Sequence, residues 1–462
     1  MLLAVSCSAL APSGMSSGVP AESSVPYIPS ARNMQQTQPA PTMFDLSGHP
    51  LSLRECISLA WENNPRTRGS WQSMQSMAAQ AGQARSERYP EVEATAGAGR
   101  SEQFSPSAQR APGTSNSFST SLGISYLLFD GGARSASIEN ADAALVSAGF
   151  RHNAVLQDIA LDVAEAYYRL LAANQFVRVA EQVIEQTQNH VNAAQARYES
   201  GIVNRSDMLR AETDRADAEL SRVRAQSQVR LARAGLANAL GLNVTDSLSI
   251  LDLPEDIPET QVDDVRELIA EALSNRPEIR SSLAQIDAGR AEVRLSRSRY
   301  WPSLTTSAGF GWFDREFLPE QRDWSIGIGL RIPVFDGFDR GYALRRSDAD
   351  LSRVIAEHAQ LSQGIELEVW NAYSGLIEAQ EAIRAVNVLT ASADEALRVA
   401  EGEYLNGVGS IILLIDAQTA QTSARVRQVQ ARLDWYTALS RMERVVGNSL
   451  LGEGTVFQGG NR

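Results

Sequence analysis

A long helical pattern occurs twice in this chain, and it restricts the possible folds more than any other feature. In the first copy, residues 155–200, apolar side chains recur every seven residues, and a second apolar series follows three residues behind. The first series is Leu156, Val163, Leu170, Val177, Ile184 and Val191, and the second is Ile159, Ala166, Ala173 and Ala180. This spacing, kept for about six heptads, is typical of a coiled coil.

The second copy lies 206 residues further along the chain. Its two series are Val369, Leu376, Ile383 and Leu397, and Ile365, Ala372, Ala379, Val386, Ala393 and Ala400. Both copies end on a tyrosine followed by a glycine, in RYESG at residues 197–201 and EYLNG at residues 403–407. A repeat of this length predicts a duplicated architecture.

The prolines separate helical from non-helical parts of the chain. Seven of the 17 prolines fall in the first 50 residues, none lies between Pro112 and Pro254, and none follows Pro333. Because a proline inside a helix costs about 3 kcal/mol, the two gaps predict long uninterrupted helices. A helix over residues 131–200 would span roughly 100 Å at ~1.5 Å per residue, which suits a bundle or tube and not a globular core.

Composition argues against several classes of function. The net charge of −13 disfavours nucleic acid as a partner and suits solubility, an acidic lumen or an acidic docking rim. The two cysteines and four histidines show no metal-ligand spacing, so no cofactor is expected. No apolar run reaches the ~20 residues of a membrane helix. We find no nucleophile, paired carboxylate or phosphate loop at a chemical spacing, so we do not expect an enzyme.

The first 48 residues read as a signal and linker segment. Residues 1–14 resemble the end of a secretory signal without its basic region. Residues 3–7 resemble a bacterial lipobox, which makes Cys7 a lipidation candidate; an ordinary cleaved signal is the alternative. Residues 12–48 are rich in Pro, Ser and Gln and are expected to form an extended linker.

Two repeats follow, over residues 49–242 and 265–448, separated by a crossover at 243–264 and followed by a tail at 449–462. Each repeat opens with a helix pair, at residues 51–68 and 265–280, broken before Pro65 and Pro277, because proline suits the first turn of a new helix. Cys56 lies in the first of these helices, where a buried small side chain is expected. Each repeat closes with a returning helix, at residues 206–242 and 410–447, after tip turns at 201–207 and 407–413.

Between the helices, the period changes to two, which predicts four strands of about 10 residues. One face of each strand is apolar and the other carries Ser, Gly and charge. The apolar positions are Val92, Ala94, Ala96 and Ala98; Phe118, Leu122, Ile124, Tyr126 and Leu128; Leu304, Ala308, Phe310 and Trp312; and Trp324, Ile326, Ile328, Leu330 and Ile332.

This alternation is typical of a transmembrane β-barrel, although one face of a soluble antiparallel sheet alternates in the same way. The small polar face, unable to fill a protein core, and the polar loops expected at residues 102–116 and 314–321 favour the barrel. FDG turns then lead into the long helices, with Asp130 and Asp336 placed as helix N-caps and Gly131 and Gly337 free to adopt unusual backbone angles. These aspartates could instead line a lumen.

Four strands cannot close a barrel, since single-chain barrels have at least eight, and an open edge in lipid would leave backbone groups unpaired. The sequence therefore predicts a mostly helical protein whose strands contribute to a barrel shared between chains. The simplest assembly is a homotrimer with twelve strands, continued by a tube of long antiparallel coiled-coil helices.

These features resemble the TolC-type channel-tunnel proteins, the outer membrane efflux protein family. The resemblance covers residues 51–447 and rests on the duplicated asparagine–proline breaks, tyrosine–strand junctions, FDG turns and Tyr-x-x-Gly tips, and on Ile415-Asp416-Ala417. It implies a Gram-negative outer-membrane protein in contact with lipid and extending into the periplasm. It also implies a periplasmic adaptor (membrane fusion protein) and an inner-membrane pump of the RND or ABC type as partners.

The resemblance also implies a periplasmic gate near the helical tips. Tyr404 and Asp416 match the family's pattern, and Asp207 and Arg205 could supply further polar contacts. Gly201 and Gly407 would permit the tip turns and leave grooves for adaptor hairpins. The arginine and aspartate often found near positions 409 and 413 are absent, so an aspartate ring in its usual form is not expected.

Function is then expected to be a passive exit duct of a tripartite efflux or type I secretion system. A soluble periplasmic coiled-coil scaffold without a pore is the alternative, but it leaves the four Gly- and Ser-lined strands unexplained. The cargo, protein or drug or metal, stays open at this point.

Overall fold

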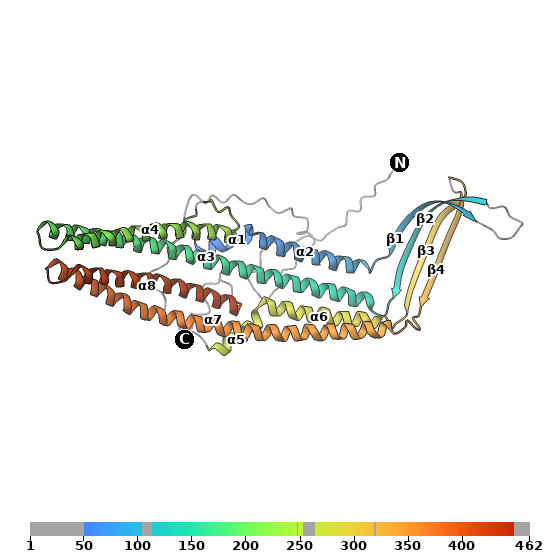
Figure 1. Cartoon of the computed structure of the whole chain (residues 1–462). Helices are drawn as coiled ribbons and strands as arrows, with labels where there is room; N and C mark the ends of the chain where they lie inside the picture. Colours follow the sequence, from blue (N-terminus) through green and yellow to red (C-terminus); the bar gives the residue numbers. More distant parts are fainter. Residues whose placement is uncertain (1–49, 104–112, 247, 253–263, 318–319, 448–462) are drawn as a thin grey trace. The chain divides into compact units, whose positions relative to one another are not determined.

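The computed structural model describes residues 50–103, 113–246, 248–252, 264–317 and 320–447. The signal and linker segment with Cys7, and the tail at 449–462, lie outside these described residues. Within them, the order of elements is helix pair, strand pair and two long helices, repeated once (Figure 1). None of the described helices is long and apolar enough to cross a membrane.

The helices of the two repeats have equal lengths. The long helices contain 67 residues each, the returning helices 36, and the short pairs 11 and 22. They are α1 (Leu53–Asn63), α2 (Pro65–Ser86), α3 (Ala133–Glu199) and α4 (Arg205–Leu240) in the first repeat, and α5 (Val265–Asn275), α6 (Pro277–Ser298), α7 (Asp339–Leu405) and α8 (Ile411–Val446) in the second. Both α2 and α6 begin on the proline that the sequence places at the break.

The chain divides into two compact units, and each contains parts of both repeats. Of the described residues, those within 50–72, 150–280 and 360–447 form one unit, and those within 73–149 and 281–359 form the other. The first holds α1, α4, α5, α8 and the later parts of the long helices; the second holds the strands and the earlier parts.

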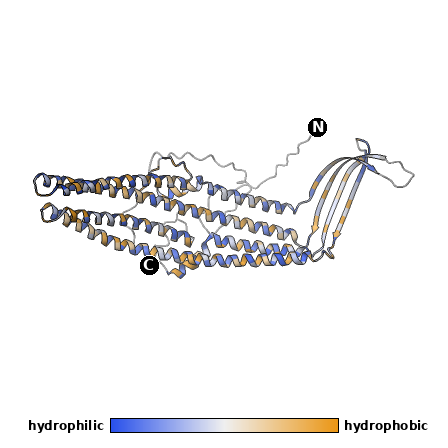
Figure 2. Cartoon of the chain, in the orientation of Figure 1, coloured by the Kyte–Doolittle hydropathy of each residue, from blue (hydrophilic) through white to orange (hydrophobic). Residues whose placement is uncertain are grey.

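The strands form one antiparallel sheet in the order β1 (Glu91–Gln103), β2 (Gly113–Phe129), β3 (Ser303–Asp314) and β4 (Gln321–Arg331). Hydrophilic and hydrophobic residues are interspersed along them (Figure 2). The prediction of about 10 residues per strand is wrong for β2, which has 17 residues. Its first residues lie in the loop expected at 102–116, and they pair with the end of β1 because Ser, Thr and Gly permit an extended ladder without an apolar signal.

The apolar face of the sheet is not covered by other described parts of the chain. Trp324, Ile326 and Ile328 of β4 are 70–75% exposed. The opposite face carries small residues, and Thr95 and Ser121 hydrogen-bond across it at 2.7 Å. Within the described residues, β1 pairs only with β2 and β4 only with β3, so the sheet has two unpaired edges.

The turns from the sheet into the long helices are held by aspartate. The Asp130 carboxylate accepts the Gly132 and Arg134 backbone N–H groups at 3.0 and 2.9 Å. Asp336 accepts the Arg340 backbone N–H at 3.2 Å and its Nε–H at 2.5 Å. Gly131 has a φ of +63°, and a Cβ there would lie 2.3 Å from that of Trp301, so this position requires glycine.

Two apolar cores, one in each repeat, stabilise the unit that contains α1, α4, α5 and α8. The heptad positions fill both: Ile159, Val163 and Leu170 of α3 pack with α1 and α4, and their counterparts on α7 pack with α5 and α8. Cys56 is fully buried in the first core, as expected, and burial followed by the charge of Glu55 raises the pKa of its thiol to about 12.

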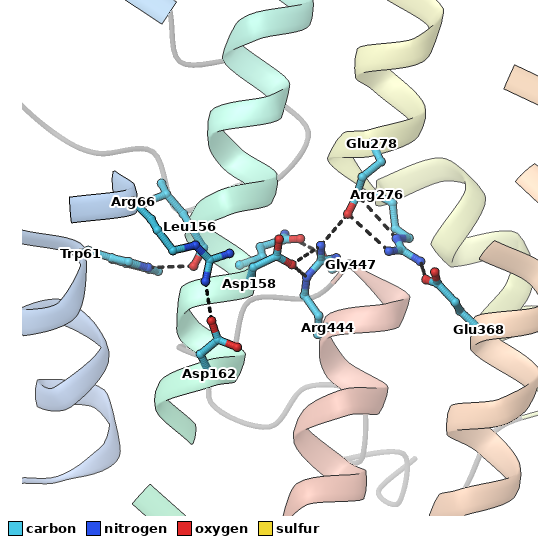
Figure 3. Close-up of polar contacts among 11 residues, drawn as sticks. Trp61, Arg66, Leu156, Asp158, Asp162, Arg276, Glu278, Glu368, Arg444 and Gly447 are labelled. Carbon is cyan, nitrogen blue, oxygen red and sulfur yellow. Dashed lines mark hydrogen bonds and ion pairs between the residues drawn. The ribbon is translucent and has the colours of Figure 1, made fainter. Parts of the chain in front are cut away.

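A buried ion network joins the two repeats where α8 ends (Figure 3). The Arg444 guanidinium, with 7% of its side chain exposed, donates to Asp158 of α3 at 2.7 Å and to Glu278 of α6 at 2.5 Å. Arg276 also pairs with Glu278, at 3.3 Å. Burial raises the pKa of Glu278, but the two arginines outweigh it, and that pKa lies below its ordinary value.

The first repeat has a simpler arrangement at the equivalent place. Arg66 of α2 pairs with Asp162 of α3 at 2.5 Å, and both side chains are more than half exposed. Trp61 donates its Nε1–H to the Leu156 carbonyl at 2.9 Å (Figure 3). In the second repeat, Arg444 also connects this place to Asp158 of the first repeat.

We predict that Arg444→Gln destabilises the protein by roughly 2–3 kcal/mol, because it leaves Glu278 and Asp158 without their buried partner. Arg441→Gln is the matched control. Arg441 of α8 pairs with Glu165 of α3, the helix that also carries Asp158, but the Arg441 side chain is 59% exposed. Its loss should lower the free energy of unfolding by less than about 1 kcal/mol. Thermal unfolding of the purified variants, followed by the helical circular dichroism signal, measures both. Equal losses would contradict the assignment.

Candidate functional site

The site begins with two tight turns at the tips of the helical hairpins. After α3, Gly201 adopts a φ of +73° and the Ile202 N–H bonds to the Arg197 carbonyl at 2.9 Å. After α7, Gly407 adopts a φ of +81° and the Val408 N–H bonds to the Glu403 carbonyl at 3.0 Å. Glycine in this left-handed conformation ends each helix without strain.

Arg197 connects the two tips within one chain. Its Nη1–H donates to the Tyr404 carbonyl at the end of α7, and its guanidinium lies 4.6 Å from the centre of the Tyr404 ring. A cation at this carbonyl also interacts favourably with the negative end of the helix dipole. Tyr404 is 2% exposed, its hydroxyl has no partner among the described residues, and burial raises the pKa of that hydroxyl.

A small apolar cluster surrounds this contact. It contains residues from all four long and returning helices, so the two hairpins share one core at the tips: Val191, Ala194, Ala211, Leu397, Ala400, Tyr404, Ile411 and Leu414. Alanines dominate the first hairpin's side of the cluster, which limits the apolar area that each contact buries.

A polar layer follows further along the hairpins. Gln418 of α8 donates to Gln186 of α3 at 2.9 Å, and Arg425 of α8 donates to Gln182 of α3 at 2.7 Å. Arg425 also pairs with Asp394 of α7 at 3.1 Å. A cavity of about 350 Å³ borders this layer, between α3, α7 and α8. The contact between the hairpins is therefore polar here, unlike the apolar cores of each repeat.

The structure separates the predicted site residues into two groups. Tyr404 is buried against Arg197, and Asp207 lies close enough to contribute to the raised pKa of Tyr404. Arg205 and Asp416 are exposed, and neither they nor Asp207 form an ion pair with another described residue. Their charges are thus available to contacts outside this chain.

The turn of the second tip leaves no room for a side chain at Gly409. A Cβ there would lie 2.9 Å from the Cβ of Glu403, so an arginine does not fit at this position. The next helix is capped by Ser410, whose hydroxyl accepts the Leu413 backbone N–H at 3.3 Å. Among the described residues, no group of three or more His, Cys, Asp or Glu side chains could hold a metal ion.

Sequence reasoning missed the residue that connects the tips. Arg197 is the first residue of the RYESG motif, but nothing in the sequence indicates that it faces Tyr404 rather than its neighbour Tyr198. It also missed His190 and Glu401, which face each other at 3.5 Å, one heptad before Arg197 on α3. The seven-residue spacing of His190 and Arg197 is the only available signal.

Known proteins match both the sequence and the fold. A model of the family "Outer membrane efflux protein" matches residues 56–242 and 268–448. Protein CyaE of Bordetella pertussis is 31% identical over 388 residues, which cover 82% of this chain and 80% of that protein. The toluene efflux pump outer membrane protein TtgC of Pseudomonas putida is 23% identical, with coverages of 86% and 83%.

Solved structures match the fold over most of the chain. The outer-membrane channel OprN superposes with a TM-score of 0.77 at 22% identity, covering 87% of this chain and 91% of that one. The open state of the Neisseria gonorrhoeae MtrE outer membrane channel gives a TM-score of 0.72 at 21% identity, with coverages of 92% and 98%. Family, relatives and fold agree: the chain belongs to the outer membrane efflux protein family, and it is a non-enzymatic outer-membrane efflux channel that extends into the periplasm.

Proposed function

We propose that this chain is one subunit of a homotrimer that forms the passive exit duct of an efflux or secretion system. The observation that carries the trimer is the sheet with two unpaired edges, β1 and β4, and an exposed apolar face. Backbone groups at such edges find no partners in lipid, so each β4 must pair with the β1 of a neighbour until the barrel closes. Three chains supply twelve strands, within the range of outer-membrane barrels.

We place the resting gate at the tips of the same trimer. Arg197 and Tyr404 hold the two hairpins of each chain together, while the exposed Asp416 and Arg205 and the partly buried Asp207 supply charge for contacts between chains. Arg197 is partly exposed and Tyr404 is buried, so this cation–π contact contributes on the order of 1–2 kcal/mol, and a partner protein could open the tips by offering modest compensating contacts.

The partner surface in this proposal is the apolar tip. Ile202 and Leu209 of the first tip, and Leu405, Val408 and Ile412 of the second, are between 46% and 81% exposed. The glycine turns at Gly201 and Gly407 keep the backbone open beside them. This surface suits the helical hairpins of a periplasmic adaptor, which would join the duct to an RND or ABC pump in the inner membrane.

The relatives support a duct that does not select its cargo by itself. Their names include a toluene efflux pump component, a cobalt-zinc-cadmium resistance protein at 25% identity, and a pyoverdine export protein at 22% identity. We therefore assign cargo choice to the pump. We also retain the domain boundaries 1–48, 49–242, 243–264, 265–448 and 449–462, and lipidation at Cys7, as proposals.

The trimer is tested by the mass of the purified protein in detergent, corrected for bound detergent. Three times the chain mass of 50.2 kDa is the expected result. A stable monomer or dimer that still forms channels would contradict the proposal.

A pair of neighbouring substitutions in β4 tests which face meets lipid. Ile328→Arg should abolish trimers, because a charge near the bilayer midplane costs roughly 2–4 kcal/mol in each subunit. Gly327→Arg lies one residue away and points to the opposite face, where water and the small Ser307 leave room, so trimers should form. The proposed topology fails if both variants assemble equally well, or if Gly327→Arg is the one that does not assemble.

The gate is tested by single-channel recording in planar bilayers. Arg197→Gln removes the cation–π contact and should raise the open fraction roughly fivefold, the ratio that ~1 kcal/mol supplies. Asp416→Ala should also raise it if that charge joins neighbouring tips. Arg210→Gln is the matched control, because Arg210 is exposed on α4 and forms no ion pair with another described residue. An unchanged open fraction in both test variants would place the gate elsewhere.

A further inference from the structure

We propose that His190 is a proton-sensitive link between the two hairpins, so that acidification favours the closed duct. The inference rests on the proposed function, because it needs the tips to act as a gate. His190 lies on α3, exactly one heptad before Arg197, and therefore on the same face of the helix. Across from it, Glu401 precedes Tyr404 by three residues on α7. The two links thus join the same pair of helices.

The imidazole of His190 is buried, and its two nitrogens, Nδ1 and Nε2, lack hydrogen-bond partners among the described residues. Its side chain is 8% exposed. Nε2 lies 3.5 Å from a carboxylate oxygen of Glu401, without the alignment of a hydrogen bond. Because buried polar atoms are rarely left unpaired, we infer that the ring also takes a protonated state in which its nitrogens are paired.

A second carboxylate comes from the first hairpin. Asp214 of α4 interacts electrostatically with His190, and its Oδ2 is also buried without a hydrogen-bond partner among the described residues. Burial and, to a smaller extent, Asp217 raise the pKa of Asp214, while His190 opposes them. A protonated imidazole carries N–H donors at both nitrogens, whereas the neutral ring has only one.

The charged groups placed against His190 are carboxylates from both hairpins, Glu401 of α7 and Asp214 of α4. On the same helices, Arg215 of α4 pairs with Glu219 at 2.8 Å, and Arg398 of α7 pairs with Glu395 at 2.5 Å. From α8, the uncharged Gln418 donates to Gln186, one turn earlier on α3.

Lowering the pH strengthens the link between the hairpins, and raising the pH weakens it. Protonation turns the His190–Glu401 contact into an ion pair between the hairpins, which adds to the Arg197–Tyr404 contact. The link is present at low pH and is lost as pH rises and the imidazole becomes neutral. Histidine is the side chain that ordinarily changes charge between pH 5 and 8, so the test compares two pH values inside that range.

The open fraction of single channels in planar bilayers, recorded at pH 8.0 and pH 5.5, tests the inference. The unmodified protein should be open about fivefold less at pH 5.5, the lower end of usual coupling between sites. His190→Gln and Glu401→Gln should each remove that difference while keeping the open fraction seen at pH 8.0. Glutamine preserves the size and polarity of both side chains but cannot titrate.

His152→Gln is the matched control. His152 is the other buried histidine of α3, it contacts the Ser70 hydroxyl at 2.8 Å, and burial lowers its pKa to about 4, so it stays neutral over the tested range. This variant should keep the full pH effect. The inference is overturned if the unmodified channel shows no pH effect, or if His190→Gln retains it. Absence of any channel would instead overturn the proposed function, and this inference with it.

Discussion

Backbone groups without hydrogen-bond partners are the constraint on which this molecule depends. One chain builds a four-stranded sheet with two such edges, and hydrocarbon cannot satisfy them. In the trimer that we propose, each edge is paired by an identical neighbour, and the barrel fixes three chains side by side. Every later feature of the chain then has to be compatible with threefold repetition, including the lengths of its helices and the charges at its tips.

The lengths of the elements follow this requirement. The helices of the two repeats match to the residue, at 67 and 36 residues for the long and returning helices. One extra residue would move a tip by about 1.5 Å and rotate it by about 100°, which would separate Arg197 from Tyr404. The four strands differ in length, at 13, 17, 12 and 11 residues. The two repeats thus have equal lengths in the helices whose tips contact each other.

The sequence predicted most of the fold because heptad and alternating patterns indicate which face of a helix or strand is apolar. Ile159 and Val163 are buried as their period requires, and the helix breaks before Pro65 and Pro277 are confirmed. Arg197 could not be found in this way, since its contact depends on the axial alignment of α3 against α7, which neither heptad pattern contains. The first residues of β2 also lacked a signal, because a run of Ser, Thr and Gly has no apolar period.

Two arginines illustrate how the strength of the contacts between the two repeats differs along the hairpins. All 42 basic residues of the chain are arginines, so the difference comes from their partners. Arg444, at the end of α8 away from the tip, donates to two carboxylates in a buried network, and separating it would leave buried charges unpaired. Arg197, at the tip, contacts a carbonyl and an aromatic ring and pairs with no carboxylate among the described residues.

The stronger contact therefore lies at the junction of the two repeats, and the weaker one at the tips, which part in the gate that we propose. Regions that move are drawn from the least stable contacts of a structure, and the small apolar cluster at the tips agrees with this. A gate that opens on contact with a partner needs a closed state only slightly more stable than the open one, because a ligand can shift the balance only by its differential affinity. A network like that of Arg444 at the tips would require a correspondingly larger differential affinity from such a partner.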